Sequence, residues 1–363
     1  MKPPRNFITH PVDEGLLLAR EDGKRLFVMN GAARFIWQLR LDGIADIQIP
    51  ALMAERYAID LGQAEQDLRS ILRHWQVEGL AEASGWRRHY RIGHQRFSVD
   101  YPDQTIADAF FPILGHLELT SGLEGEVKRG FVLNLEGRRY VLRADGAELL
   151  SSEEIDEVMA RLAHEAILFA FNNSDWLIST HAAAVSNGRG CALLPGVSGS
   201  GKSTLAAALL TRPHLRYLTE DLALLDRANL HVIPVPGALI LKHGSWTPLE
   251  PLLGALSSQT VHHRHDQDVR YLAPAREKIA PAPAPVAVIA FPRYTPNAEA
   301  SLARISTLEG LTRLIAAPSM VSPPITPQAL GRLTKWAEGI PFYTLAYGSV
   351  TEAVALIEGL LPI

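Results

Sequence analysis

The spacing of apolar residues in the first 85 positions predicts two short strands followed by three helices. The apolar runs Leu16–Arg20 and Arg25–Met29 flank the polar segment Glu21–Lys24, a pattern typical of a tight hairpin. Asn30 then stands where a helix N-cap is expected. Apolar residues at helical spacing predict helices over 32–41, 50–57 and 63–79. We therefore expect residues 1–85 to form a small winged-helix-like α+β domain.

The pattern of residues 86–180 predicts a small α/β lobe. Four short apolar runs have the composition of strands, and Glu153–Phe171 carries apolar residues at helical spacing. The predicted strands cover 91–92, 97–99, 131–133 and 140–142. This segment holds no evident candidate chemistry, so we interpret it as a scaffold for residues 181–363, the third predicted domain.

The third domain contains a glycine-rich loop between a predicted strand and a predicted helix. The apolar run Gly190–Leu194 leads into Gly-x-x-x-x-Gly-Lys-Ser, and Thr204–Leu210 reads as a helix. Glycines let such a loop point several backbone N–H groups at one phosphate, and the helix N-terminus adds its positive end. The candidate phosphate-binding residues are Gly196, Val197, Ser198, Gly199, Ser200, Gly201, Lys202, Ser203 and Thr204.

This loop predicts a nucleoside triphosphate as ligand, with Mg²⁺. Lys202 would supply a cation for the outer phosphates, and the hydroxyl of Ser203 would bind the metal ion. ATP and GTP are equally compatible with the pattern, and we expect ATP.

Two adjacent carboxylates follow the loop at short range. The apolar strand that begins at Arg216 ends in Glu220 and Asp221, 18 and 19 positions after Lys202. One helix and one turn fit between, so we expect this strand to neighbour the strand of the loop. Side chains alternate in direction along a strand, so the two acids cannot face the phosphate in the same way. One would hold Mg²⁺ and the other would meet the nucleophile; the alternative is a solvated strand end.

Composition narrows the class of protein. The 363 residues suffice for two or three domains. A net charge of -4 argues against nucleic acid as the main partner. The single cysteine, Cys191, excludes an internal disulfide, and no apolar stretch approaches the roughly 18 residues of a membrane helix. We expect a cytoplasmic protein without a membrane partner.

The N-terminal segment resembles the PqqD-like family of peptide chaperones. The stretch Gly23–Trp37 has a phenylalanine-bearing strand and an Ile-Trp helix like those of the family, with Met-Asn where members typically have Leu-Asn, and 57–80 fits the family's closing helix. Helix spacing alone explains Phe35, Ile36 and Trp37 as core residues. The resemblance implies a domain that binds the leader of a precursor peptide as an added strand.

The remainder resembles the HPr kinase/phosphorylase family, and more closely its branch linked to peptide modification. The resemblance is carried by His181–Val185, by the loop Ser198–Ser203 and by the acidic pair, with further similarity in 234–242, 269–274 and 289–294. It implies a P-loop kinase domain of that type over 181–363, with 86–180 as its small α/β lobe. HPr itself is not the expected substrate, because the segment that recognises it is not recognisable here.

Residue by residue, the resemblance implies a catalytic centre. It implies that Lys202 binds the phosphates and that Ser203 and Asp221 bind Mg²⁺. It also implies that Glu220 acts as the base and that His181 lies beside it. The chain has Glu-Asp where Asp-Asp or Asp-Glu is usual, so which acid is the base stays open. Also open are the roles of Lys242, Arg270, Arg293 and His262–His265. We interpret the polar stretch 257–268 as a mobile loop over the site rather than a metal site.

The hypothesis that unites these features is an ATP- and Mg²⁺-dependent kinase. It would transfer the γ-phosphoryl group to a hydroxyl, serine by preference, of a ribosomally made precursor peptide held by residues 1–85. One alternative is a nucleotide-dependent peptide carrier that hydrolyses ATP without transfer. Another is a small-molecule kinase with a regulatory N-terminal domain. The acceptor and the oligomeric state, homo-oligomer included, stay open.

Overall fold

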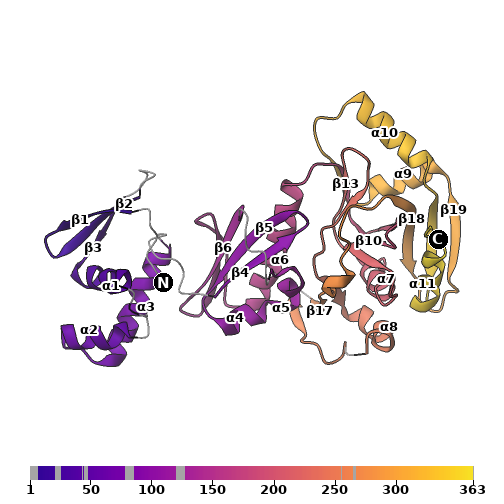
Figure 1. Ribbon diagram of the computed structural model, residues 1–363. Coiled ribbons are helices and arrows are strands. Elements are labelled where there is room, and N and C mark those ends of the chain that lie inside the picture. Colours follow the sequence, from indigo (N-terminus) through magenta and orange to yellow (C-terminus); the bar gives the residue numbers. More distant parts are fainter. Residues whose placement is uncertain are drawn as a thin grey trace. The chain divides into compact units, whose positions relative to one another are not determined.

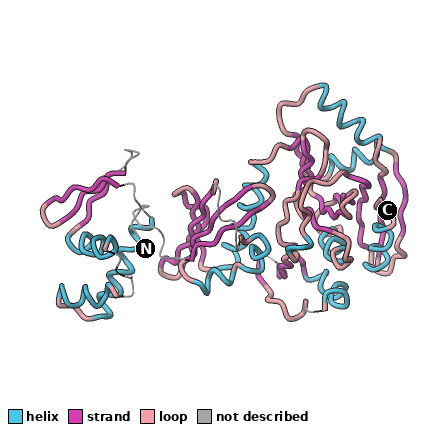
Figure 2. Tube along the Cα trace, viewed as in Figure 1, coloured by secondary structure: helices cyan, strands magenta, loops and turns pink. Residues whose placement is uncertain are grey.

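The computed structural model describes residues 7–20, 26–42, 44, 48–77, 86–119, 127–254, 256–264 and 267–362 (Figures 1 and 2). The chain divides into two compact units, Met1–Arg87 and Arg88–Ile363, which we describe separately. The predicted turn at 21–24, the end of the third predicted helix at 78–79, and His265 with Asp266 lie outside the described residues.

The first unit has a three-stranded antiparallel sheet and three helices. Its elements are β1 (Phe7–Val12), β2 (Gly15–Arg20), β3 (Leu26–Met29), α1 (Gly31–Leu41), α2 (Ile49–Tyr57) and α3 (Leu61–Val77). The prediction of two strands is wrong in number, because β1 pairs with β2 along its whole length. Most side chains of β1 are exposed, so no hydrophobic alternation marks it in the sequence. The sheet order β1-β2-β3 makes β2 the central strand and β3 an edge strand.

The helices of the first unit confirm the predicted pattern. The side chain of Asn30 accepts a hydrogen bond of 2.9 Å from the backbone N–H of Ala33, so it caps α1 as expected. The buried face of the sheet packs on the helices around Trp37 and Trp75, whose rings meet edge to face at 5.4 Å. These contacts form a core of the unit's own.

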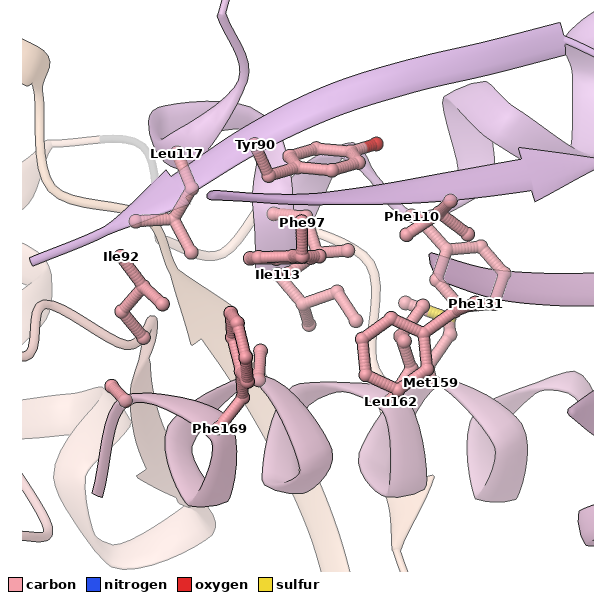
Figure 3. Packing of buried hydrophobic residues seen from close by; sticks show 14 of the residues in the cluster. Tyr90, Ile92, Phe97, Phe110, Ile113, Leu117, Phe131, Met159, Leu162 and Phe169 are labelled. Carbon is pink, nitrogen blue, oxygen red and sulfur yellow. The ribbon is translucent and has the colours of Figure 1, made fainter. Parts of the chain in front are cut away.

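The second unit begins with a five-stranded sheet covered by one long helix. The sheet has the order β4-β5-β6-β7-β8, with β4 (Trp86–Ile92), β5 (Gln95–Tyr101), β6 (Arg129–Glu136), β7 (Arg139–Ala144) and β8 (Ala147–Ser152). The short helices α4 (Gln104–Ala109) and α5 (Phe111–Leu114) and the 3-10 turn η1 (Gly115–Leu117) follow β5. Helix α6 (Ile155–Asn172) lies along the sheet and points Met159, Leu162 and Phe169 into it (Figure 3). The four predicted strands and the helix are confirmed, and β8 is additional.

A six-stranded mixed sheet forms the centre of the second unit, with the order β12-β10-β11-β18-β21-β19. Its strands are β10 (Ala182–Ser186), β11 (Cys191–Pro195), β12 (Arg216–Thr219), β18 (Val286–Tyr294), β19 (Ser301–Ile305) and β21 (Phe342–Tyr347). Strands β11, β18 and β21 are parallel to one another, and β10 is antiparallel to both β11 and β12. The expectation that β12 neighbours β11 is wrong. Strand β10 forms a hairpin with β11 and therefore already occupies that position.

Helices cover both faces of this sheet (Figure 1). One face packs on α7 (Lys202–Leu209), α8 (His243–Leu253) and α11 (Val350–Glu358), and the other packs on α9 (Thr307–Ala316) and α10 (Pro327–Glu338). The second face also meets the small sheet β14-β13-β9-β20, made of β9 (Trp176–Thr180), β13 (Ala223–Asp226), β14 (Val232–Ile233) and β20 (Ser319–Val321). No helix among the described residues is long and apolar enough to cross a membrane.

A small three-stranded sheet includes part of the stretch 257–268, which we interpreted from the sequence as a mobile loop: residues 262–264 and 267–268 are strand, whereas 257–261 lie in neither helix nor strand. Strands β15 (Leu239–Lys242), β16 (His262–Arg264) and β17 (Gln267–Leu272) form an antiparallel sheet in the order β15-β17-β16. A 3-10 turn, η2 (Arg276–Lys278), follows. The histidine-rich stretch is therefore an ordered hairpin strand as far as Arg264, because pairing with β17 satisfies its backbone.

Candidate functional site

The pairing of β10 brings three segments that are far apart in the sequence together at the ends of neighbouring strands of the central sheet. Ala182, at the start of β10, lies opposite Pro195, at the end of β11, and Ala184 lies opposite Thr219, at the end of β12. Since β10 runs antiparallel to both neighbours, His181 just before it meets the residues that follow β11 and β12. The backbone N–H of Gly196 donates to the carbonyl of His181 at 3.2 Å. The loop and the acidic pair therefore flank His181.

The glycine-rich loop has the backbone geometry that its sequence requires. Gly199 and Gly201 have φ of +83° and +97°, in the left-handed region that favours glycine. A side chain at Gly201 would collide with the hydroxyl of Tyr347, which donates to the Gly201 carbonyl at 3.1 Å. Gly201 is the N-cap residue of α7. The first N–H groups of α7 have no partner within the helix, and this helix begins directly after the loop.

A cavity of about 520 Å³ opens beside the loop. Its lining includes His181, Ser198, Gly199, Gly201, Lys202, Ser203, Thr204, Glu220, Asp221, Ile240, Lys242, Gly244, Ser245, Pro248, Arg264, Gln267, Tyr294 and Tyr347. Thr204 and Ser245 share a hydrogen bond of 2.7 Å at this wall. The structure thus gathers the four predicted catalytic residues, and most of the predicted loop residues, around one hollow.

Two lysines contact the loop from different elements. Lys202, the first residue of α7, is 5% exposed, and its ammonium donates to the carbonyl of Val197 at 3.1 Å. Burial lowers the pKa of Lys202, while the charges of Glu220 and Asp221 act in the opposite direction. Lys242, the last residue of β15, donates to the hydroxyl of Ser198 at 2.8 Å. Both lysines therefore place positive charge in the cavity beside the loop.

The two acids have different surroundings, as strand alternation predicts. Glu220 is buried and accepts a hydrogen bond from the hydroxyl of Ser203. Burial, together with the charge of Asp221, raises the pKa of Glu220 to about 7. Asp221 is more exposed than Glu220, and its Oδ1 lies 3.0 Å from Nδ1 of His181. Burial pushes the pKa of Asp221 upward, but the contact with His181 and the charges of Lys202 and Arg264 together hold that pKa below its usual value.

Not every predicted residue lines this cavity. Gly196, Val197 and Ser200 line a second hollow, of about 780 Å³, on the other side of the loop, together with Arg293. Arg270 does not line the first cavity. Its guanidinium stacks over the ring of Trp246 at 4.0 Å and donates to the carbonyl of Ser257. The role of Arg270, left open by the sequence, is in this structure a contact with Trp246 and Ser257.

Several cavity residues have no signal in the local sequence. Tyr294 and Tyr347 end strands β18 and β21, and they reach the loop only because β18 pairs in parallel with β11 and β21 pairs in parallel with β18. Arg264 and Gln267 come from the hairpin of β16 and β17. These four residues could be assigned to the cavity only once the pairing of their strands was known.

Comparison with known proteins places the N-terminal part of the chain. Residues 14–81 match the family model described as "Coenzyme PQQ synthesis protein D (PqqD)". The chain is therefore a mixed α/β protein with a PqqD-like domain at its N-terminus.

Among solved structures, one that is similar is described as "TbiB1 in Complex with the TbiA(beta) Leader Peptide". It is 24% identical, with 24% of this chain and 100% of that chain covered and a TM-score of 0.22, a value too low to support any structural argument. A comparison with curated proteins finds no match.

The buried carboxyl of Glu220 predicts a pH dependence of stability. Its pKa of about 7, against an ordinary value of 4.5, means that the folded protein keeps a proton that the unfolded chain has released. This group's contribution to stability is therefore lost as the pH rises through about 7. Between pH 5 and pH 8 we expect Glu220 to lower the free energy of unfolding by about 1–3 kcal/mol.

Urea unfolding of the wild type and of Glu220→Gln at both pH values measures this contribution. The variant should lose less stability than the wild type over that interval, because glutamine does not titrate. Equal losses in the two proteins would contradict the assignment of a raised pKa to Glu220.

Proposed function

We propose that this chain is an ATP- and Mg²⁺-dependent kinase that phosphorylates a hydroxyl, serine by preference, of a ribosomally made precursor peptide held by its N-terminal domain. The observation that carries the proposal is the meeting of Lys202, Ser203, Glu220, Asp221 and His181 in one cavity at a glycine-rich helix N-terminus. This combination offers an anion site, a cation site and a candidate base within one hollow. Phosphoryl transfer requires these three elements.

The loop supplies the anion site. The N–H groups at the start of α7, which have no partner within the helix, and the positive end of the helix dipole favour phosphate oxygens. Lys202 lies at the first position of that helix and is buried, so its charge is best compensated by an anion in the cavity. Lys242 adds a second positive group at Ser198. The triphosphate of ATP matches this site in charge.

The oxygen donors at the edge of the cavity fit Mg²⁺. No group of three or more His, Cys, Asp or Glu side chains suited to a metal is found in the part of the chain that the structure describes. Mg²⁺ does not need one, since it is commonly held by one or two carboxylates, phosphate oxygens and water. The Ser203 hydroxyl and the Glu220 carboxylate are already in contact, and Asp221 is next in the chain. Bound there, Mg²⁺ would neutralise charge on the transferring phosphate.

The contacts favour a division of roles between the acids. Glu220 touches Ser203, so it belongs with the metal ion rather than with the acceptor. Asp221 lies at the more exposed side, and His181 orients its carboxylate. We therefore assign proton removal from the acceptor hydroxyl to Asp221 and metal binding to Ser203 and Glu220. This reverses the assignment that the family resemblance implies for Glu220 as base and Asp221 as metal ligand.

The N-terminal domain would deliver the peptide. Its edge strand β3 exposes Leu26 and Val28, which are 69% and 81% accessible. An extended peptide that pairs with this edge gains main-chain hydrogen bonds, and such apolar side chains give it contacts on one face. The match to the PqqD model supports a peptide-binding role. Tethering the peptide would raise its effective concentration at the kinase site.

The first prediction separates the two acids. Asp221→Asn should still bind Mg·ATP but lose about 10²–10⁴-fold in the rate of peptide phosphorylation, as expected for a lost general base. Glu220→Gln should instead raise the Mg²⁺ concentration needed for half-maximal activity. Initial rates at varied Mg²⁺, with calorimetry of nucleotide binding, measure both effects. Lys202→Ala serves as the control that is deficient in nucleotide binding.

The outcome of that experiment also decides between the possible functions. Wild-type transfer rates in both acid variants would refute the proposed mechanism. ATP hydrolysis without any phosphorylated product would favour the peptide carrier. A phosphorylated small molecule would favour the small-molecule kinase.

The second prediction concerns delivery of the peptide. Removal of residues 1–85 leaves β4 and the second unit's cores intact, so Mg·ATP affinity should be unchanged. The KM for the full precursor should rise strongly, because the tether is lost. Steady-state kinetics on precursor and on leaderless core peptide test this. An equal kcat/KM for the precursor in full-length and truncated protein would show that the N-terminal domain does not deliver the substrate.

A further inference from the structure

The histidine-rich strand β16 is fixed to helix α6 by a single carboxylate. Nδ1 of His262 lies 2.8 Å from Oδ1 of Asp156, and the backbone N–H of His263 donates to Oδ2 at 2.7 Å. Asp156 belongs to the first turn of α6. His262 is buried, and its ring packs at 5.1 Å from that of Tyr271 on β17. Both oxygens of Asp156 are thus used to hold the start of the strand.

Arg264 follows on the same strand and reaches the cavity. Residues two apart on a strand point to the same side, so the position of His262 determines the side on which Arg264 lies. Arg264 lines the hollow that also contains Lys202 and Asp221. Its Nε is buried and has no hydrogen-bond partner among the described residues. Arg264 and Asp221 also line a smaller neighbouring hollow together, and the charge of Arg264 helps to lower the pKa of that carboxyl.

The charges of the cavity indicate what Arg264 would contact. Three cations, Lys202, Lys242 and Arg264, face two carboxylates, Glu220 and Asp221. With a divalent ion present, the excess of positive charge matches a polyanion such as a nucleoside triphosphate. A guanidinium presents a planar fork of donors that suits phosphate oxygens, and a buried Nε without a partner is costly unless a ligand satisfies it.

We propose that Arg264 binds the terminal phosphate of the nucleotide and that the Asp156–His262 contact is the anchor that positions it. This inference rests on the proposed nucleotide-binding function. It gives the lobe formed by residues 86–180 a part in the active site, because Asp156 in that lobe determines where Arg264 points. Arg264 would act on the γ-phosphate, since it lines the cavity together with Asp221, which we assign to the acceptor of that phosphate.

Calorimetry of two nucleotides tests the assignment on the full-length protein with Mg²⁺. AMP-PNP carries a terminal phosphate in the γ position, and ADP does not. Arg264→Gln should weaken AMP-PNP binding about tenfold or more, as expected for a lost charge-assisted hydrogen bond, and change ADP binding less than about twofold. Arg264→Lys should retain part of the affinity. Arg270→Gln, on the same hairpin but stacked on Trp246, is the matched control and should change neither.

A double-mutant cycle tests the anchor. Asp156→Ala should weaken AMP-PNP but not ADP, and it should have no further effect in the Arg264→Gln background. Asp156→Asn keeps one oxygen acceptor and should lose less. Melting temperatures without nucleotide identify any variant that is merely unfolded, in which case Asp156→Asn carries the cycle.

Three results would overturn the inference. Equal losses for AMP-PNP and ADP would mean that Arg264 does not discriminate the γ-phosphate. Additive effects of Asp156→Ala and Arg264→Gln would mean that the anchor does not act through Arg264. Unchanged nucleotide affinity, with a raised KM for the peptide, would place Arg264 on the acceptor instead. If the wild type binds neither nucleotide, the proposed function itself fails.

Discussion

The antiparallel pairing of β10 with both β11 and β12 is the constraint on which the candidate site depends. Because β10 runs antiparallel to its two neighbours, its first three residues lie opposite their last residues, with Ala182 facing Pro195 and Ala184 facing Thr219. Ala182, Ala183 and Ala184 are fully buried. Such small side chains let α7 pack closely on one face of β10 and the sheet β14-β13-β9-β20 on the other. Without β10 in this place, His181 and the acids would not meet the loop.

Charge burial is the physical cost of this arrangement. Lys202 and Glu220 are both nearly inaccessible, and their pKa values move in the directions that disfavour the charged forms. Proteins rarely bury such groups unless partners compensate them. The contacts within the cavity compensate them only in part, through Val197 for the lysine and Ser203 for the acid. Groups with perturbed pKa values that share a cavity are typical of functional sites.

Local sequence was enough to predict features whose cause is local. The cap at Asn30, the left-handed glycines of the loop and the strand before the acids all follow from the chemistry of neighbouring residues. The position of β12 could not be predicted in this way, because it depends on β10, which pairs with both β11 and β12 and so lies between them. The same holds for Arg264, which reaches the cavity through its pairing with β17 and through Asp156, 108 positions earlier.

The two units divide the proposed work. The first offers an edge strand with exposed apolar side chains, and its core does not depend on the second. The second holds the cavity, which is built from the central sheet, α7 and the β15–β17 hairpin sheet. In the proposed function, the first unit would capture the peptide and the second would carry out phosphoryl transfer.

The central claim is that the loop Gly196–Ser203 holds a nucleoside triphosphate with its metal ion. A crystal structure of the full-length protein with Mg·AMP-PNP tests this claim most directly. The account predicts the phosphates against the N-terminus of α7 and the Mg²⁺ ion in contact with Ser203 and Glu220, with Asp221 left free for the acceptor. Nucleotide density elsewhere, or a cavity empty at saturating Mg·AMP-PNP, would contradict it.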